Sequence, residues 1–254
     1  MHSIVANWHQ FCRDMGSTET VTKGGSLFVR KTAHFACDFC NCSIVESVPS
    51  QQALADLVQI SGENGVHNLG LYVLGPVGSF RVSGSPEPRS SVIMVYDSLH
   101  RRHANRLKIE VLNPLDVKAF ADLVFSAFGY DESNKRESMD SYLEGIRSER
   151  VRLMGGYEDG KLVTCAMTHR DKKTCAIELV STAPEARGKG LATSLVEGVV
   201  EDLIDSGMEL IWLFANCNSS AFRIYKRIGF CEISDLTTFR IPALREAQSE
   251  GAAY

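Results

Sequence analysis

The run APEARGKGLATSL, residues 183–195, places two glycines and two cations between a strand-like segment and a helical pattern. A strand that enters a helix through glycines forms an anion site, because the first helical amides have no partner within the helix. The aligned peptide dipoles add about half a positive charge there. Gly188 and Gly190 let a phosphate approach the backbone without meeting a Cβ, and Arg187 and Lys189 add charge. The run therefore predicts a phosphate-binding turn.

The spacing of this turn argues against two common phosphate sites. A Walker loop needs GxxxxGK[ST], which the run does not contain. A dinucleotide fingerprint, GxGxxG, starts at Gly188 and Gly190, but Thr193 stands where the third glycine belongs. An isolated GxG after a strand is typical of an ordinary turn. The ligand must therefore be inferred from the residues around it.

Two motifs in a fixed order supply those surroundings. Residues 187–192, RGKGLA, fit RxxGxA and follow Thr182-Ala183-Pro184, and residues 218–230, NSSAFRIYKRIGF, fit NxxAxxxYxxxGF. Both motifs resemble those of the GNAT superfamily of N-acyltransferases, in which the first forms the acyl-CoA loop. Thr182 is a departure, because the family usually has valine there. The likeness covers only the second half of the chain.

The elements expected in that half, from about residue 107 to 241, follow the same order as the family. They are a strand, two helices, three strands, a loop and helix, a strand, a helix and a last strand. Asn113 is a predicted N-cap with Pro114 at the first helical position. Asp159-Gly160 predicts a hairpin turn. The resemblance implies a mixed, mostly antiparallel α/β (α+β) sheet flanked by helices over residues 105–243.

The first half contains four apolar, β-prone runs, SLFVRK, CSIVESV, LGLYVLG and SVIMVYD, and a predicted helix near residues 49–60 with Ser50 as its cap. The polar, basic stretch at 97–106 is the best boundary. Residues 1–104 are therefore expected to form a smaller αβ domain. It is either a degenerate second copy of the GNAT-like fold or an unrelated lid over the acceptor pocket. Residues 244–254 are expected to be a mobile tail.

The resemblance also implies a cofactor site for acetyl-CoA, used as a cosubstrate. The diphosphate would lie on the turn amides, and the pantetheine arm would follow the backbone of Val180 and Thr182 as an added strand does. Asn218 would cap the last helix and touch the arm, and Ala221 would be small to let it pass. The turn amides expected to bind are those of Gly188, Lys189, Gly190, Leu191, Ala192 and Thr193.

Acyl transfer to an amine needs a base, because a lysine-like ammonium has a pKa near 10.4 and is almost never neutral at pH 7. Glu178, on the strand before the loop and expected on the same side as Val180, is the first candidate. His169 and Asp171 are weaker ones. Tyr225 fits the family's general-acid tyrosine, which would protonate or hydrogen-bond the leaving CoA thiolate. The resemblance therefore implies direct transfer of an acetyl group to a primary amine.

Alternatives to that function stay open. The second half could be a non-catalytic acyl-CoA sensor, or a transferase acting on protein lysines or N-termini, although a small-molecule amine is the favoured acceptor. A formal net charge of -4 argues against nucleic-acid binding. No apolar run approaches the ~20 residues that span a bilayer.

Cysteine usage indicates a reducing environment. Eight cysteines without a signal-peptide pattern at the N-terminus predict free thiols and a cytoplasmic protein. Cys37, Cys40 and Cys42 cluster as CDFCNC, but no second ligand pair completes a zinc site. No metal is therefore expected.

Overall fold

The computed structural model describes residues 1–22, 25–29, 41–66, 68–97 and 107–242 of the 254. The chain divides into two compact units. The first comprises residues 1–16 and 90–236, and the second comprises 17–89 and 237–254. These units do not coincide with the segments 1–104 and 105–243, because the N-terminal helix and a strand from the first half belong to the first unit. The role expected for the N-terminal segment stays a prediction.

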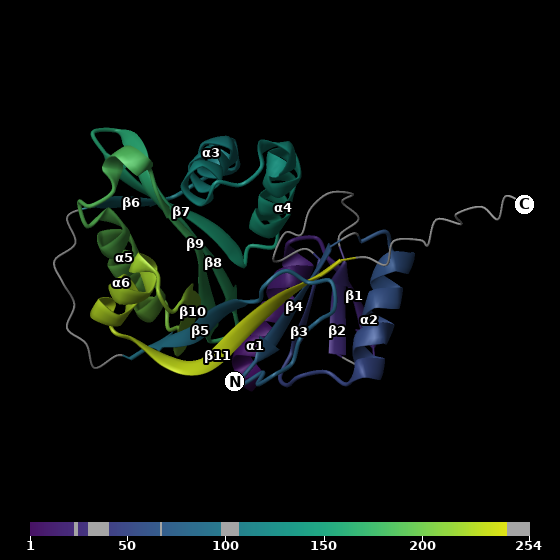
Figure 1. Ribbon diagram of the computed structural model, residues 1–254. Helices are drawn as coiled ribbons and strands as arrows, with labels where there is room; N and C mark the ends of the chain where they lie inside the picture. The colour runs from purple at the N-terminus through teal and green to yellow at the C-terminus, as the bar shows by residue number, and fades with distance from the viewer. Residues whose placement is uncertain (23–24, 30–40, 67, 98–106, 243–254) are drawn as a thin grey trace, which may run out of the picture. The chain divides into compact units, whose positions relative to one another are not determined.

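The first unit is a mixed sheet with helices on both faces (Figure 1). Its strands lie in the order β11-β5-β10-β9-β8-β7-β6. The β5–β10, β9–β8, β8–β7 and β7–β6 pairs are antiparallel, and β10–β9 is parallel. This mostly antiparallel sheet confirms the fold class expected from the sequence. Its strands are β5 (Arg89–Tyr96), β6 (Lys108–Val111), β7 (Val151–Glu158), β8 (Lys161–Asp171), β9 (Thr174–Thr182), β10 (Leu210–Asn216) and the beginning of β11 (Phe230–Pro242).

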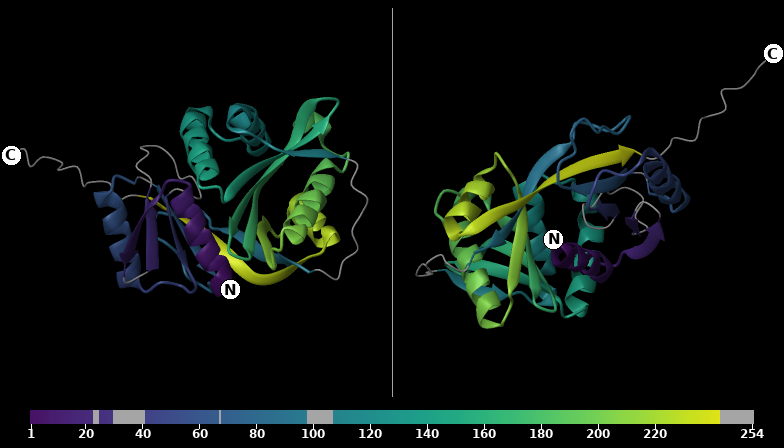
Figure 2. Two further views of the ribbon diagram at one scale, coloured as in Figure 1. Left: turned by 180° about the vertical axis from the view of Figure 1, so that it is seen from behind. Right: turned by 90° about the horizontal axis from the view of Figure 1, so that it is seen from below.

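Helices α5 and α6 cover one face of this sheet, and α3 and α4 cover the other (Figures 1 and 2). The apolar stripe of α5 packs on β7–β10 to form the main core of the unit. Helix α1 packs on β8 and β9 and against α4. The helices are α1 (His2–Asp14), α3 (Val117–Phe128), α4 (Lys135–Arg147), α5 (Leu191–Asp205) and α6 (Ser220–Ile228).

Local signals fix several of these boundaries as expected. The Asn113 side chain accepts a hydrogen bond from the Leu115 amide at 2.8 Å and starts the turn that leads into α3. Asp159 and Gly160 both have positive φ, 51° and 76°, and join β7 to β8 in a two-residue turn. Helix α1 was not among the elements expected from the sequence.

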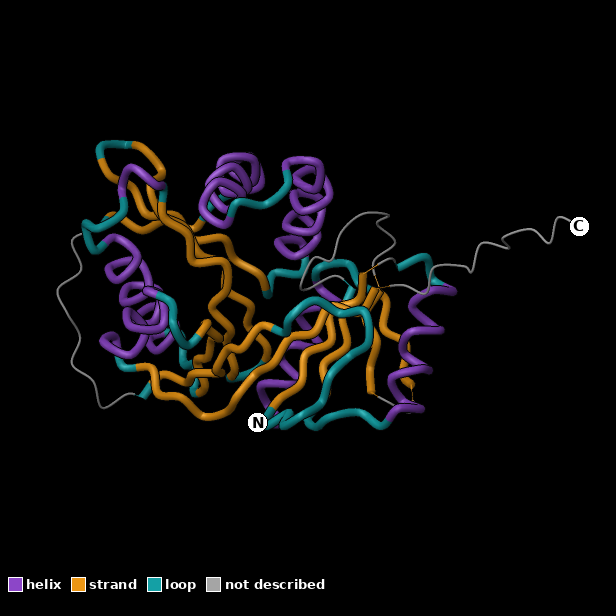
Figure 3. The backbone as a smooth tube through the Cα atoms, viewed as in Figure 1, coloured by secondary structure: helices purple, strands orange, loops and turns teal. Residues whose placement is uncertain are grey.

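The second unit has four strands and a helix of its own (Figure 3), and its buried apolar side chains form a hydrophobic core. Strands β1 (Thr18–Thr22), β2 (Gly25–Val29), β3 (Cys42–Val45) and β4 (Asn68–Leu74) lie in that order, and the end of β11 follows β4. Helix α2 (Gln51–Glu63) is capped by Ser50, which accepts from the Ala53 amide at 3.2 Å. β1 was not foreseen, whereas the runs predicted as strands match β2 to β5.

Several expectations fall outside the described residues, namely Cys37, Cys40, most of the 97–106 boundary and the tail. Cys42 is buried at the start of β3. Among the described helices, none is long and apolar enough to cross a membrane. No group of His, Cys, Asp and Glu in the described part of the chain could hold a metal ion.

Candidate active site

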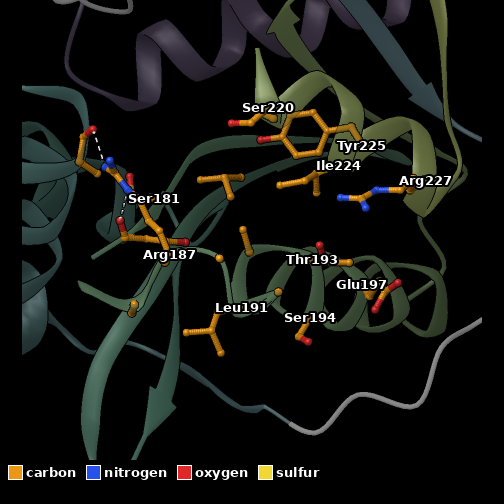
Figure 4. Close-up of a pocket in the computed structure, with 18 of the residues that line it drawn as sticks. Ser181, Arg187, Leu191, Thr193, Ser194, Glu197, Ser220, Ile224, Tyr225 and Arg227 are labelled. Atoms are coloured by element: carbon orange, nitrogen blue, oxygen red, sulfur yellow. Dashed lines mark hydrogen bonds between the residues drawn. The ribbon is translucent and has the colours of Figure 1, made fainter. Parts of the chain in front are cut away.

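A cavity of about 980 Å³ opens in the first unit, where β9 ends and α5 begins (Figure 4). Its walls come from the end of α3, the end of β9, the turn before α5, the first two turns of α5 and one face of α6. Its lining residues are Ala127, Phe128, Val180, Ser181, Thr182, Ala186, Arg187, Gly188, Gly190, Leu191, Ala192, Thr193, Ser194, Glu197, Ser220, Ala221, Ile224, Tyr225 and Arg227.

The glycines of the turn are required by backbone conformation. Gly188 and Gly190 have φ of 81° and 80°, in the left-handed region that side chains disfavour. A Cβ at either position would meet no atom within 4 Å, so dihedral strain and not crowding selects glycine. Gly190 is the N-cap of α5, and its carbonyl accepts the first helical bond, from the Ser194 amide at 3.0 Å. Helix geometry leaves the amides of 191–193 without an intrahelical acceptor, at the positive end of a 15-residue helix.

The side chains of Arg187 and Lys189, expected to add charge for a phosphate, both bind other groups of the protein. Arg187 donates to the Thr182 carbonyl at 3.3 Å and to the Ala127 carbonyl at 3.1 Å, which ties the turn to the ends of β9 and α3. Lys189 forms an exposed ion pair with Glu158 at 2.8 Å and does not line the cavity. Lys189 is therefore paired with an opposite charge, whereas Arg187 keeps its positive charge at the turn beside the backbone amides.

The two central strands separate beside the cavity. β9 and β10 are in parallel register for three residues only, from Thr174 opposite Leu210 to Ala176 opposite Trp212, although both strands continue. Between the β8 pairings of Glu178 and Ser181, β9 has a bulge at Leu179, whose φ is 52°. The C-terminal end of β9, residues 180–182, thus lines the cavity, and its backbone groups are not hydrogen-bonded to β10.

The bulge corrects one expectation about Glu178. Its side chain was expected on the same side as Val180, but the extra residue breaks the alternation, and only Val180 lines the cavity. Glu178 is 6% exposed, and its Oε1 has no hydrogen-bond partner among the described residues. Burial raises the pKa of Glu178 to about 8.

Tyr225, unlike Glu178, lines the cavity. Its hydroxyl points into the cavity, and its ring packs against Phe230 with centroids 5.9 Å apart (Figure 4). Burial, and secondly the charge of Glu178, raise the pKa of Tyr225. The two side chains expected to act as base and acid therefore interact electrostatically.

His169 lies on β8, fully buried, with both ring nitrogens engaged. Nδ1 is 3.1 Å from the Asn7 amide nitrogen, and Nε2 is 3.0 Å from an Asp14 carboxylate oxygen. Asp171 is at the hairpin end of β8, opposite Thr174. Neither residue lines the cavity.

The cavity brings together most of the residues singled out from the sequence, namely Val180, Thr182, Arg187, Gly188, Gly190, Leu191, Ala192, Thr193, Ala221 and Tyr225. Lys189, Asn218 and Glu178 do not line it. Asn218 is not the cap of α6, because Ser219 has the extended N-cap conformation and accepts from the Phe222 amide at 3.1 Å.

Sequence reasoning missed part of the wall made by α6. Ser220, Ile224 and Arg227 follow helical spacing i, i+4 and i+7, on the face that also carries Ala221. That periodicity could have identified them, because Ala221 on the same helix face was already expected to lie beside the pantetheine arm. Phe128 and Ala127 carry no such signal, since only the tertiary fold brings the end of α3 to the turn.

Comparisons with known proteins agree with this architecture. Residues 117–230 match the sequence model of the Acetyltransferase (GNAT) family. A protein of the GNAT family from Novosphingobium aromaticivorans is 19% identical, with TM-score 0.61, covering 88% of this chain and 91% of its own. A GCN5-related N-acetyltransferase from Kribbella flavida is 12% identical, with TM-score 0.67, covering 94% and 95%. No curated protein matches.

The fold and the cavity thus define a GNAT-type acetyltransferase architecture. The part of the chain that matches the GNAT family model contains both motifs, and the two solved structures share the fold of this chain.

Proposed function

We propose that this protein transfers an acetyl group from acetyl-CoA to a primary amine, by direct attack within a ternary complex. The observation that carries the proposal is the cavity, which has unbonded helix amides at one point and the Tyr225 hydroxyl at another. The charge of a buried carboxyl, Glu178, contributes to the raised pKa of that hydroxyl.

The donor would be held by backbone groups. The amides at 191–193 would receive the diphosphate, and the edge of β9 at Val180 and Thr182 would pair with the amide groups of the pantetheine arm, as an added strand pairs with a sheet edge. Arg187 would act through the turn, because its guanidinium already binds two carbonyls.

Glu178 is suited to receive the proton of the amine. An ordinary glutamate with a pKa near 4.3 is about six units below a lysine-like ammonium, a transfer that costs roughly 8 kcal/mol. Burial raises the pKa of Glu178 to about 8, which reduces that cost to roughly 3 kcal/mol. At pH 7 about a tenth of the molecules hold the carboxylate form, a cost of roughly 1.4 kcal/mol.

Tyr225 would donate a hydrogen bond or a proton to the leaving thiolate. The protonation states of Glu178 and Tyr225 are coupled in a direction that favours this step. The charge of Glu178 contributes to the high pKa of Tyr225, so protonation of Glu178 removes that contribution. In the step itself the amine nitrogen bonds to the thioester carbon, its proton passes through water to Glu178, which does not line the cavity, and the C–S bond breaks. The thiolate then accepts a hydrogen bond or the proton from Tyr225, which is restored through solvent.

An amine screen that monitors free CoA tests the proposal, with Tyr225→Phe as the paired variant. We expect at least one small primary amine to release CoA from acetyl-CoA, and the variant to bind CoA normally while turning over at least tenfold more slowly. Binding of CoA without release by any amine or lysine peptide would instead support the sensor function. Unchanged turnover in the variant would remove Tyr225 from the mechanism.

A further inference from the structure

A side chain of helix α1 bridges the two strands on either side of β9. Ala176 on β9 is opposite His169 on β8, and it is also opposite Trp212 in the last residue pair that joins β9 to β10. At this level the amide nitrogen of Asn7 is 3.1 Å from Nδ1 of His169, and its carbonyl oxygen accepts from the Trp212 indole at 2.8 Å. All four side chains are buried, so solvent does not compete for the two bonds of this amide bridge.

Glu178 follows on the same face of β9. Cys175 and Ile177 belong to the core under α5, so strand alternation puts the side chains of Ala176 and Glu178 on the other face, on which α1 packs. The bulge of β9 comes only after Glu178. Glu178 is therefore one side-chain row beyond the amide bridge, about 7 Å along the strand, where β10 no longer pairs with β9.

A second residue of α1 packs at the same place. The ring of Trp8 lies 5.6 Å from the Trp212 ring, and it stacks on the Phe214 ring at 5.6 Å with an angle of 18° between the planes. Phe214 is the next residue on that face of β10, past the last residue pair with β9. Helix α1 therefore supports β10 both where it pairs with β9 and where the two strands have separated.

We propose that Asn7 is a positioning residue for acyl transfer, whose amide holds β8 and β10 at a fixed spacing and thereby fixes the place of Glu178 on β9. The inference rests on the proposed function, because it takes Glu178 as the proton acceptor. Asparagine suits the bridge, since one short planar amide offers an acceptor to an indole, which can only donate, and a donor to an imidazole nitrogen. Asn7 lies outside residues 117–230, which match the family model, so the bridge comes from the N-terminal helix of this chain.

Steady-state kinetics with an active amine, together with calorimetry of CoA binding, test the assignment on the full chain well below its Tm. Asn7→Leu has nearly the same size without polar atoms. A misplacement of about 1 Å can lower a rate about 10²-fold, so we expect kcat to fall at least about tenfold while the Kd for CoA stays within about twofold. The Kd should be spared because the turn before α5, and not β10, is proposed to bind the diphosphate.

Trp212→Phe is the milder variant, and it decides the question if Asn7→Leu does not fold. It removes only the indole donor and keeps an aromatic ring beside Trp8, so kcat should fall about threefold with the same Kd.

Arg150→Ala is the matched control for the stability of α1. It removes the ion pair with Asp14 at 2.6 Å, about two turns along α1 from Asn7, and leaves the amide bridge in place. Its stability should fall, but its kcat should stay within about twofold of the unmodified protein.

A kcat that is unchanged in folded Asn7→Leu, or in Trp212→Phe, would overturn the role of Asn7. An equal loss of kcat in Arg150→Ala would also overturn it, because the effect would then follow from the stability of α1. Both outcomes leave the unmodified protein active and the proposed function intact. Absence of turnover by the unmodified protein with every amine would instead overturn the proposed function, and this inference with it.

Discussion

Glu178 and His169 are both buried, titratable and carried by neighbouring strands of one sheet, but their surroundings differ. Glu178 has a carboxyl oxygen without a partner and a pKa raised by burial to about 8. His169 has a partner on each nitrogen. A buried polar group without a partner costs stability, so its retention points to function, whereas a fully bonded one is explained by the fold.

The bonds around His169 even fix its tautomer. The Trp212 indole can only donate, and it donates to the Asn7 carbonyl oxygen at 2.8 Å. The Asn7 amide nitrogen must then donate to Nδ1 of His169, which leaves the proton on Nε2, facing Asp14. Burial lowers the pKa of His169 and keeps the ring neutral. With no free lone pair and no exposure, His169 cannot serve as the base.

Asp14 completes this cluster at the end of α1. Burial alone would raise the pKa of its carboxyl, but hydrogen bonds from Arg150, at 2.6 and 2.7 Å, and from His169 outweigh it and hold the pKa well below its usual range. The cluster thus anchors α1 to the sheet.

Loss of the Glu178 carboxylate should produce the largest effect. Glu178→Gln keeps the shape but cannot accept a proton, so kcat should fall about 10²- to 10³-fold while CoA affinity stays within about twofold. In the unmodified enzyme kcat/KM should fall about tenfold per pH unit below about 8, because only the ionised carboxylate accepts the proton. A pH–rate profile of the variant should lack that limb.

Glu178→Gln should also be more stable than the unmodified protein, so a loss of activity in this variant would not be due to unfolding. A carboxyl whose pKa is raised in the fold keeps a proton that the unfolded chain has released, so stability falls as pH rises from about 4.5 to about 8. Glu178→Gln removes this dependence, and its Tm at pH 8 should exceed that of the unmodified protein by a few degrees. A less stable variant would mean that the carboxyl is structural.

The opposite result is expected for His169→Ala. It leaves Asp14 and Asn7 buried with missing partners, so the free energy of unfolding should fall by about 2–4 kcal/mol, read by denaturant titration. CoA affinity of the folded protein should not change. Asp171→Asn, two residues along β8, should stay within about 0.5 kcal/mol.

This cluster also predicts acid sensitivity. The pKa values of His169 and Asp14 are both lowered in the fold, so their contribution is present at neutral pH and is lost as pH falls below about 6.5 for the histidine and below about 4 for the aspartate. His169→Ala should flatten the decline between pH 6.5 and 5. An unchanged decline would assign it to other groups.

The contrast between these regions also shows what a sequence can reveal. The turn at Gly188 and Gly190 is local, because its dihedral angles and its motif lie within a few residues, and it could be predicted. The partners of His169 lie 155 and 162 positions away, on a helix that no local signal connected to the sheet. The bulge at Leu179 could not be predicted either, because positive φ is rare for leucine and nothing in the sequence indicates it.

A smaller effect is expected where only the backbone is strained. Gly190→Ala adds a methyl group that meets no atom, yet at φ of 80° it should cost about 1–2 kcal/mol of stability and weaken CoA binding severalfold. Gly62→Ala in α2 is the matched control, because its Cβ would also enter open space without a positive φ, and it should stabilise by about 0.5–1 kcal/mol. Equal responses from the two would show that conformation does not select the glycine at the turn.

The smallest effect should come from Lys189, although it stands in the middle of the motif. Its side chain is 51% exposed and pairs with a Glu158 that is 40% exposed, so Lys189→Ala should cost less than about 1 kcal/mol of stability. Because Lys189 is paired with Glu158 and does not line the cavity, CoA affinity should fall less than about threefold at physiological salt. Arg187→Ala should weaken binding more, since it releases the turn from β9 and α3. A larger loss for Lys189 than for Arg187, measured by calorimetry under the same conditions, would show that side-chain charge and not the shaped backbone holds the diphosphate.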